Sequence, residues 1–343
     1  MHLEIKKKQK TGRFPAISAE ISVRITWGIR FKPEEIRIMK KILVTGGTVF
    51  VSKYIAEYYI KAGNEVYVLN RNHHPQPKGA VLIEGDRHDP GDKLKGYTFD
   101  AVLDVTAYTG EDVEQLLDAL GEFKDYILIS SSAVYPEYLS QPFTEEQETG
   151  ANKHWGTYGT GKIDAEKALL KQVPSAYVFR PPYLYGPGNN VYREAFVFEC
   201  AEKDRKFYLP RKGEMKLQFF HVMDLCRCID SVLEKHPENH IFNVGNEDTV
   251  SIREWVNLCY EAAGKKPEFA EVYLDVNPRE YFSFHDYEYR LDVEKQRSLI
   301  SNTLSLQEGL EESYLWYQGH KEEVNKKDYI RYLDEKFGST LPE

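Results

Sequence analysis

The sequence is poor in cysteine and contains no long apolar run, and these two absences exclude several classes of protein. Only four of its 343 residues are cysteines, and their spacing fits neither a disulfide framework nor a zinc site. No stretch approaches the roughly 18 consecutive apolar residues of a membrane-spanning helix. We therefore expect a cytoplasmic protein with reduced, partly buried thiols and no membrane partner. The cysteines are Cys200, Cys226, Cys228 and Cys259.

Glycine is missing at two positions of a turn that would ordinarily carry three. Residues 41–52 read Lys-Ile-Leu-Val-Thr-Gly-Gly-Thr-Val-Phe-Val-Ser, an apolar strand that enters a glycine turn and then a helical stretch. In a dinucleotide-binding turn the first glycine makes the bend, the second admits the pyrophosphate and the third lets the helix pack on the strand. Gly46 fills the first position, but Val49 and Ser52 occupy the second and third. The turn predicts a nucleotide-binding fold with an altered phosphate loop.

Positive charge is in the minority, with 45 Lys and Arg against 54 Asp and Glu. Residues 1–38 hold nine of the basic residues and only four of the acidic ones, so they carry +5 and the remainder carries −14. We expect these residues to be an extension outside the fold, and a basic arm for an acidic partner is the alternative. The excess of negative charge in the remainder disfavours nucleic acid as a partner, although a local basic patch stays possible.

Apolar strands alternate with helices through the first half of the chain, which indicates a parallel sheet with helices on both faces. In such a sheet the ligand binds at the carboxyl ends of the strands. Strands are predicted over residues 41–45, 65–69, 80–83, 101–105 and 126–129, and helices over 54–60 and 111–120.

After Pro181 the pattern loosens into short strands and helices. Strands are predicted over residues 217–222 and 241–244, and a helix over 252–263 follows the capping sequence Ser-Ile-Arg-Glu. The predicted fold class is α/β, a Rossmann-like doubly wound parallel sheet with a smaller C-terminal substrate lobe. The predicted parts are a nucleotide-binding domain at 39–180, a lobe interleaved with the sheet at 181–320, and a solvated tail helix at 321–343.

Tyr158 and Lys162 lie four residues apart at the start of a predicted helix, so their side chains share one helix face. A cation beside a phenol favours the phenolate and lowers the tyrosine pKa from about 10. Such a tyrosine can exchange a proton with a substrate hydroxyl while a nicotinamide exchanges hydride. Alone, the pair is more often an ordinary surface pair. Its position after the glycine turn and a strand that ends in three serines (residues 130–132) favours catalysis.

Several motifs occur in a fixed order. They are residues 45–47 (Thr-Gly-Gly), 131–135 (Ser-Ser-Ala-Val-Tyr), 158–162 (Tyr-x-x-x-Lys), 180–188 (Arg-Pro-Pro-Tyr-Leu-Tyr-Gly-Pro-Gly) and 221–224 (His-Val-Met-Asp). Across about residues 40–310 the chain resembles the extended short-chain dehydrogenase/reductase family, the NAD-dependent epimerase/dehydratase group.

The resemblance implies roles for particular residues. Ser131 is expected to be the catalytic serine, with Ser132 as second choice; Tyr158 is the expected acid/base, and Lys162 is expected also to hold the nicotinamide ribose. A homodimer formed through two sheet-flanking helices is expected from the resemblance alone. The implied cofactor-binding residues are Gly46, Gly47, Thr48, Val49, Phe50, Val51, Asn70, Arg71, Asp86, Arg87, Thr106, Ala107, Tyr158, Lys162, Pro181 and Tyr183.

The end of the second strand bears on which dinucleotide is preferred. An acidic residue there accepts the ribose 2′-hydroxyl of NAD, whereas an arginine suits the 2′-phosphate of NADP. The sequence has Asn70-Arg71, which favours NADP slightly, although a merely solvated arginine is the alternative.

The chain also departs from the usual pattern of the family. Leu217-Gln218 stand where nucleotide-sugar epimerases commonly place Arg-Asp, so we expect no ordinary diphosphate clamp. An atypical branch that includes the chloroplast stem-loop RNA-binding proteins resembles the chain at residues 47–50, 218–225 and 242–244. That branch tolerates a bulky residue at the second glycine, but its plant members lack the tyrosine that this chain retains at 158.

Two functions follow from these motifs. One is an NAD(P)-dependent epimerase/dehydratase or reductase for a sugar or nucleotide-sugar-like alcohol or ketone, with a Ser-Tyr-Lys site. The other is an RNA-binding or ribonuclease-like protein, or a dinucleotide sensor without turnover. We expect no metal site, because His73, His74 and His88 lack ligand spacing.

Overall fold

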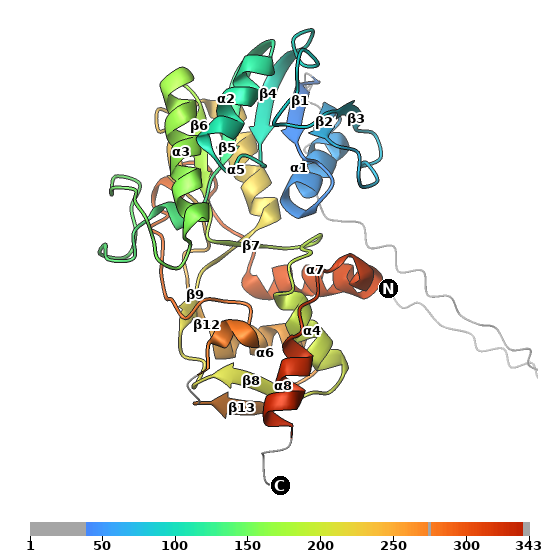
Figure 1. The fold of residues 1–343 in the computed structure, drawn as a ribbon, viewed down its shortest axis with the longest axis vertical. Helices are drawn as coiled ribbons and strands as arrows, with labels where there is room; N and C mark the ends of the chain where they lie inside the picture. The colour runs from blue at the N-terminus through green and yellow to red at the C-terminus, as the bar shows by residue number, and fades with distance from the viewer. Residues whose placement is uncertain (1–38, 274–275, 339–343) are drawn as a thin grey trace, which may run out of the picture. The chain divides into compact units, whose positions relative to one another are not determined.

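A seven-stranded parallel sheet forms one half of the computed structural model, which describes residues 39–273 and 276–338 (Figure 1). Its strand order is β11-β6-β5-β4-β1-β2-β3, and every pairing is parallel. The predicted doubly wound α/β fold is thereby confirmed. The strands are β1 (Lys41–Thr45), β2 (Glu65–Asn70), β3 (Val81–Glu84), β4 (Thr98–Asp104), β5 (Glu122–Ile129), β6 (Tyr177–Arg180) and β11 (Ile241–Asn243).

Helices cover both faces of this sheet. On one face α1 (Phe50–Lys61) and α5 (Val222–Lys235) bury side chains against Ile42 and Val44, and on the other α2 (Gly110–Ala119) and α3 (Thr157–Gln172) pack with Leu43. Successive side chains of a strand point to opposite faces, so one continuous apolar run fills two cores. All four cysteines are buried and free.

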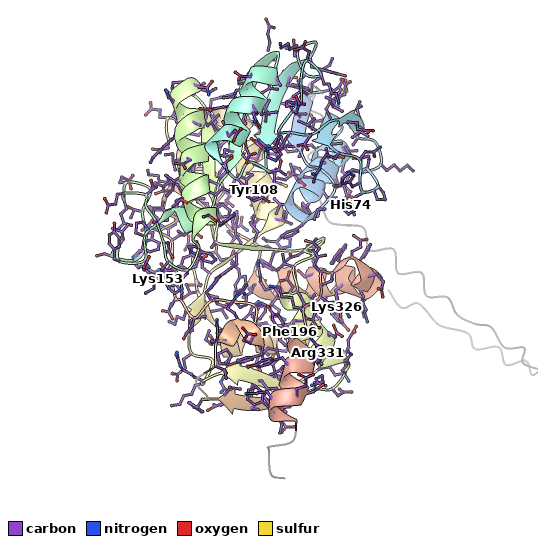
Figure 2. The ribbon with its side chains drawn as sticks, in the orientation of Figure 1. His74, Tyr108, Lys153, Phe196, Lys326 and Arg331 are labelled. Carbon is purple, nitrogen blue, oxygen red and sulfur yellow. The ribbon has the colours of Figure 1, made fainter. Side chains whose placement is uncertain are left out.

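The second lobe packs around an aromatic core that includes Trp255 and Phe196, which is labelled in Figure 2. Its helices are α4 (Glu194–Glu202), α6 (Ile252–Ala262), α7 (Leu306–Gly319) and α8 (Tyr329–Phe337). Its strand pairs are β7 (Tyr183–Tyr185) with β10 (Phe219–His221), β8 (Phe207–Pro210) with β13 (Phe269–Val272), and β9 (Lys216–Leu217) with β12 (Val250–Ser251). Short 3-10 turns occupy Ser132–Val134, Pro278–Glu280, Lys295–Ser298 and Lys321–Glu323.

The second half of the chain differs from the prediction at two places. The single strand expected at residues 217–222 is divided into β9 and β10, and α5 already begins at Val222 because the His221 ring accepts a hydrogen bond from the Met223 N–H. The tail helix expected to be solvated has one buried face, formed by Tyr329, Leu333 and Phe337. Period-four spacing of large apolar residues within a charged segment is the signal for that face.

The predicted domain limits stay predictions, although β11 and α5 do return to the sheet from the second half, as the interleaved lobe requires. The expectation for residues 1–38 lies outside the described residues. The helix that begins at Ile252 has the predicted capping box, with Ser251 and Glu254 bonded reciprocally. Within the described residues, no helix is both long enough and apolar enough to span a membrane.

Gly47 provides a stability test with an internal control. A Cβ at Gly47 would lie 2.4 Å from Cγ1 of Val68, whereas a Cβ at Gly63 would meet nothing within 4 Å, and the two residues have φ values of 85° and 83°. Gly63→Ala should cost about 1–2 kcal/mol for the left-handed backbone alone. Gly47→Ala should cost a further 1–3 kcal/mol, roughly, for overpacking. Urea unfolding of both variants measures the difference, and equal losses would contradict a tight β1–α1 turn.

Candidate active site

Two cavities meet at the carboxyl ends of the sheet strands, where the strand order reverses between β1 and β4. The first, of about 370 Å³, lies beside the ends of β1 and β2; the second, of about 490 Å³, extends towards α3 and the second lobe. Both are lined by Val49, Ser52, Thr106 and Tyr108, so they form one continuous trough. Figure 2 labels Tyr108 at this edge of the sheet. Ligands of doubly wound sheets bind at this edge.

The glycine turn retains its bend despite the two missing glycines. Gly46 and Gly47 both have positive φ, and an added Cβ on Gly46 would lie 2.9 Å from Oγ of Ser52. Ser52 is buried, and its Oγ donates to the Val49 carbonyl at 2.9 Å. The Ser52 side chain thus occupies the space beside Gly46 that would be empty if residue 52 were the third glycine. The Val49 side chain, 40% exposed, projects into the trough beside the start of α1.

The end of β2 supports the turn rather than presenting a free side chain. Asn70 Nδ2 donates to the Gly46 carbonyl at 2.7 Å, which ties the second strand to the first glycine. The Arg71 side chain is 64% exposed and lies 4.0 Å from the Asp86 carboxylate. The preference for NADP that we derived from Arg71 therefore stays a prediction.

Ser131, Tyr158 and Lys162 all line the larger cavity. Lys162 is 2% exposed, and its ammonium donates to the carbonyls of Ala107 (2.7 Å) and Ile129 (2.8 Å). Tyr158, one turn earlier, is 41% exposed. The helix α3 can lie close to the main chain at Tyr108 and Ala133 because Gly161 and Gly159 lack side chains. A Cβ added to Gly161 would lie 2.3 Å from the Tyr108 carbonyl oxygen, and one added to Gly159 would lie 2.5 Å from the Ala133 carbonyl oxygen.

The expected effect of Lys162 on Tyr158 is wrong for the structure as described. Although 41% of the residue is exposed, desolvation of the hydroxyl raises the pKa of Tyr158 above its ordinary value, and a hydrogen bond with Ser131 offsets part of that rise. Burial also lowers the pKa of Lys162 to about 8. The ammonium turns inward to main-chain carbonyls, so the four-residue spacing places the two groups on one helix without making the lysine the dominant influence on the phenol.

The two candidate serines have different surroundings. Ser131 Oγ accepts from the Ala133 N–H at 3.2 Å, and its hydroxyl also interacts with Tyr158. Ser132 is buried, and its hydroxyl donates to the Tyr289 hydroxyl at 3.1 Å. The geometry therefore favours Ser131 as the serine nearest the candidate acid/base.

Comparison with known proteins places this geometry in a family. Residues 42–245 match the NAD dependent epimerase/dehydratase family. The chain belongs to this family.

Relatives of the chain are found among epimerases and beyond them. The chain is 29% identical over 304 residues to the "Chloroplast stem-loop binding protein of 41 kDa b" of Arabidopsis thaliana, a match that covers 80% of this chain and 78% of the relative. It is 26% identical to the UDP-glucose 4-epimerase of Corynebacterium glutamicum over 65% of this chain and 80% of that enzyme.

Solved structures share the fold. The UDP-glucuronic acid 4-epimerase from Bacillus cereus, crystallised in complex with NAD, superposes with a TM-score of 0.66 at 20% identity. The match covers 81% of this chain and 99% of that enzyme. An identity this low shows a common fold and no more.

Arg87 has a structural role that its expected place among the cofactor-binding residues did not reveal. It does line the smaller cavity, but its guanidinium bonds to both oxygens of Asp104 (2.8 and 3.2 Å), to Thr106 Oγ1 (2.9 Å) and to the Asp112 carbonyl (2.7 Å). Asp104 is fully buried and also accepts from Thr45 at 2.8 Å. Arg87 therefore lines the cavity while it neutralises a buried carboxylate. Asp86 also lines the smaller cavity, and its side chain is 41% exposed.

Several residues of the larger cavity were not predicted from the sequence. Among them, Trp155, Tyr289 and Arg193 line the cavity, and Tyr108 lies near Tyr158 with ring centroids 6.3 Å apart. Tyr289 and Arg193 lie outside the family motifs quoted above, so one sequence offers no signal for them. Trp155 lies in the turn before α3, which begins at Thr157, so helical spacing from Tyr158 does not indicate it either.

Arg87→Met tests the buried pair, with Arg71→Met as the control. Burial raises the pKa of Asp104, but the Arg87 charge and hydrogen bonds from Arg87, Tyr126 and Thr45 outweigh that effect and hold the pKa below its ordinary value. Removing one partner of a buried pair costs about 3–5 kcal/mol, whereas an exposed pair contributes about 0–1 kcal/mol. We expect a large loss of unfolding free energy for Arg87→Met and almost none for Arg71→Met.

The pH dependence gives this prediction a sign. In the wild type, the lowered pKa of Asp104 contributes stability that is present above the unfolded pKa, near 4, and is lost as pH falls. In Arg87→Met the buried Asp104 carboxyl loses its cation, so protonation of this carboxyl at lower pH stabilises the folded variant. The difference between the two proteins, measured by urea unfolding, should shrink from pH 7 towards pH 4; a constant difference would contradict the role given to Asp104.

Proposed function

We propose that the chain is an NAD-dependent enzyme that acts on an alcohol or ketone of a sugar or a sugar-like compound through Ser131, Tyr158 and Lys162. The observation that carries the proposal is the convergence of these three side chains in one cavity that continues into the glycine turn. Membership of the epimerase/dehydratase family and the redox chemistry of its relatives support it.

The trough fits a dinucleotide along its length. Gly46, Thr48 and Asn70 line or support the smaller cavity, which suits the adenosine half, and the start of α1 offers main-chain N–H groups to the phosphates. Pro181 and Tyr183 line the larger cavity beside Lys162, where the nicotinamide half would lie. When bound, NAD supplies a hydride acceptor at this end. The choice between NAD and NADP is left to experiment.

Each residue of the proposed set has a task that its surroundings suit. Ser131 holds the substrate oxygen next to Tyr158, and Tyr158 exchanges the hydroxyl proton while hydride leaves or joins the same carbon. Tyrosine, with an ordinary pKa of about 10, is a neutral phenol near neutral pH, the form that donates a proton to a ketone oxygen, and burial moves the pKa of Tyr158 further in that direction. Lys162 has three N–H donors, and two carbonyls engage it, so one donor remains for a ribose hydroxyl.

Binding of a stem-loop nucleic acid is the second candidate. The observation in its favour is that the match to the chloroplast stem-loop binding protein covers 80% of this chain, against 65% for the match to the Corynebacterium glutamicum epimerase. The charge of −14 outside residues 1–38 opposes it, because affinity for nucleic acid rests on phosphate contacts by Lys and Arg. The retained Tyr158–Lys162 pair favours the enzyme.

The proposal predicts which substitutions lower the reaction rate and which lower only the stability of the protein. Tyr158→Phe should lower the oxidation of NADH by a keto sugar by about 10²–10⁴-fold, the usual contribution of general acid–base catalysis. Ser131→Ala should lower it by roughly 10²–10³-fold, as loss of a hydrogen bond to the reacting oxygen does. Absorbance at 340 nm across a panel of sugars and nucleotide sugars measures the rate.

Ser132→Ala is the matched control in the same strand end. Its hydroxyl bonds to Tyr289, so its loss should cost about 1 kcal/mol of stability while changing the rate only a few-fold. Equal rates in Tyr158→Phe and the wild type would remove Tyr158 as the acid/base. A rate loss in Ser132→Ala as large as in Ser131→Ala would contradict the assignment of Ser131.

Lys162 predicts a pH limit for cofactor affinity. Its pKa of about 8 lies below the ordinary lysine value, so the ammonium is present at pH 7 and is lost as pH rises above about 8. NAD⁺ affinity, measured by calorimetry, should therefore fall between pH 7 and pH 9.5. The Lys162→Met variant should bind NAD⁺ more weakly than the wild type at pH 7, and its affinity should not fall between pH 7 and pH 9.5. A wild-type affinity that stays constant over this range would contradict a contact between Lys162 and the cofactor.

A further inference from the structure

The substrate end of the larger cavity carries positive charge only. Its lining includes Trp155, Tyr183, Tyr289 and Arg193, and no Asp or Glu is among the described residues that line it. The other cation there, Lys162, is engaged by two carbonyls. Arg193 is therefore the charge that faces the space in which the proposed substrate would lie.

Arg193 is held by a main-chain carbonyl and two aromatic rings rather than by an ion pair. Its Nη1 donates to the Leu184 carbonyl at 3.0 Å, and its guanidinium carbon lies 5.1 and 5.7 Å from the ring centroids of Tyr183 and Phe284. Across residues 39–273 and 276–338 it forms no ion pair with a carboxylate within 4.0 Å. The neighbouring Glu194 is buried and accepts from Asn189. Burial holds the pKa of Glu194 above its ordinary value, and the Arg193 charge offsets only part of that rise.

A half-buried guanidinium with free donors is costly to keep unless it binds something. Burying a charge without a partner is unfavourable, and arginine offers five N–H donors in a rigid fork that matches carboxylate and phosphate groups. One of these donors is used by a carbonyl. Its charge also lowers the pKa of Tyr158, which places it within electrostatic range of the candidate acid/base. The site is thus preorganised for an anion close to the reacting centre.

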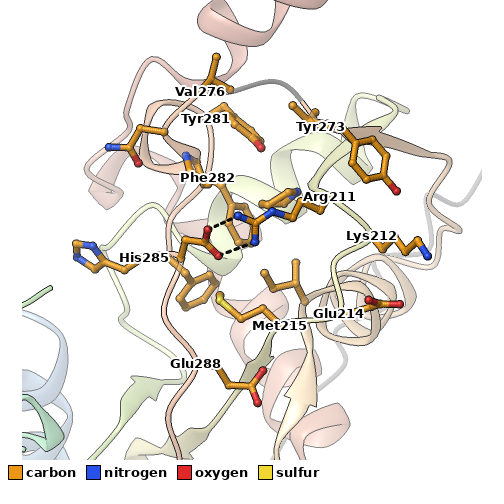
Figure 3. Close-up of a pocket in the computed structure, with 17 residues that line it drawn as sticks. Arg211, Lys212, Glu214, Met215, Tyr273, Val276, Tyr281, Phe282, His285 and Glu288 are labelled. Carbon is orange, nitrogen blue, oxygen red and sulfur yellow. Dashed lines mark hydrogen bonds and ion pairs between the residues drawn. The ribbon is translucent and has the colours of Figure 1, made fainter. Parts of the chain in front are cut away.

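The cavity of about 850 Å³ in the second lobe is less suited to a diphosphate. It contains Arg211, but both terminal guanidinium nitrogens of that residue bond to the Asp286 carboxylate at 2.8 and 3.3 Å (Figure 3). The same cavity is also lined by Glu214 and Glu288, and Lys212 is the further cation among its described lining residues. Its charges are therefore already compensated, with acidic groups in excess.

The residues at the expected clamp position point into the core. Leu217 and Gln218 are each 1% exposed. The Gln218 amide donates to the carbonyls of Asn246 (2.7 Å) and Leu291 (3.3 Å) and accepts from the Leu291 N–H at 2.8 Å. Neither side chain can reach a ligand phosphate.

We infer that the substrate carries a single anionic group, a carboxylate or a phosphate monoester, which Arg193 binds beside the reacting hydroxyl, and that it is not a nucleoside diphosphate sugar. This inference rests on the proposed function for its reacting site. It makes Arg193 a specificity-determining residue, because a neutral sugar would leave the guanidinium unpaired.

The experiment measures binding to the full-length protein, with NAD⁺ affinity recorded first and separately. Glucuronate and glucose 6-phosphate represent the two anionic classes, glucose the neutral analogue, and UDP-glucuronic acid the diphosphate class. Calorimetry should show the better of the two monoanionic sugars binding at least tenfold tighter than glucose and than UDP-glucuronic acid. Arg193→Met should weaken that sugar by about 10–150-fold, the equivalent of a charged hydrogen bond, and leave glucose unchanged.

Two further variants make the outcome decisive. Arg193→Lys, which keeps the charge and loses the fork, should recover part of the affinity, and Arg211→Met in the separate cavity should change nothing. Unchanged NAD⁺ affinity in Arg193→Met shows that the variant is folded.

Three results would overturn the inference and leave the cofactor site unaffected. The first is that UDP-glucuronic acid binds more tightly than the monoanionic sugars and that its binding depends on Arg211. The second is that Arg193→Met loses as much affinity for glucose as for the anionic sugar, and the third is that NAD-saturated protein binds no anionic sugar. Failure to bind NAD⁺ would instead count against the proposed function, and the sugar titrations of the protein without cofactor would still decide the role of Arg193.

Discussion

The candidate site depends on one buried ammonium. Lys162 crosses from α3 to the carbonyl of Ala107, which follows β4, and to that of Ile129, which ends β5. These bonds bring three segments, distant in sequence, to one point at the carboxyl edge of the sheet. Because two glycines remove the side chains that would hold the helix away, the main chain of α3 approaches both neighbouring loops closely. Tyr158 and Ser131 acquire their positions from this docking.

Two buried ion pairs hold the segments around this point. Arg87, which lines the smaller cavity, pairs with the buried Asp104, and Arg180 bonds to the Glu166 carboxylate from Nε (3.0 Å) and Nη2 (2.6 Å). Tyr135 extends the second network by donating to Asn243 at 2.7 Å, which connects β6, α3 and β11. Such pairs contribute little net stability when intact but cost much when broken. These pairs fix the geometry of the trough. Arg193 differs from them because the anion that we propose for it belongs to the substrate.

The sequence predicted well those features that depend on local chemistry. A strand, a glycine bend and a helix in order identify the β1–α1 turn, and apolar strands alternating with helices identify a parallel sheet. The capping box at Ser251 is also a local pattern, in which two side chains satisfy each other's backbone. Features that depend on the direction of a side chain in space were not predictable in this way.

Three residues show where that limit lies. Spacing placed Lys162 beside Tyr158, but burial and two carbonyls decide where its charge acts. Arg87 was expected only as a cofactor-binding residue, and the structure also makes it the partner of a buried carboxylate 17 positions away. Arg193 belongs to no motif, and its significance appears only when the rings beneath it and the cavity before it are known.

The central claim is that the trough beneath the altered glycine turn is a dinucleotide site. Calorimetric titration of the full-length protein with NAD⁺ and NADP⁺, with and without a stem-loop RNA, tests it most directly. The account predicts saturable binding of one dinucleotide per chain that RNA does not displace. Absence of binding by either dinucleotide at millimolar concentration, with tight binding of the RNA, would contradict it.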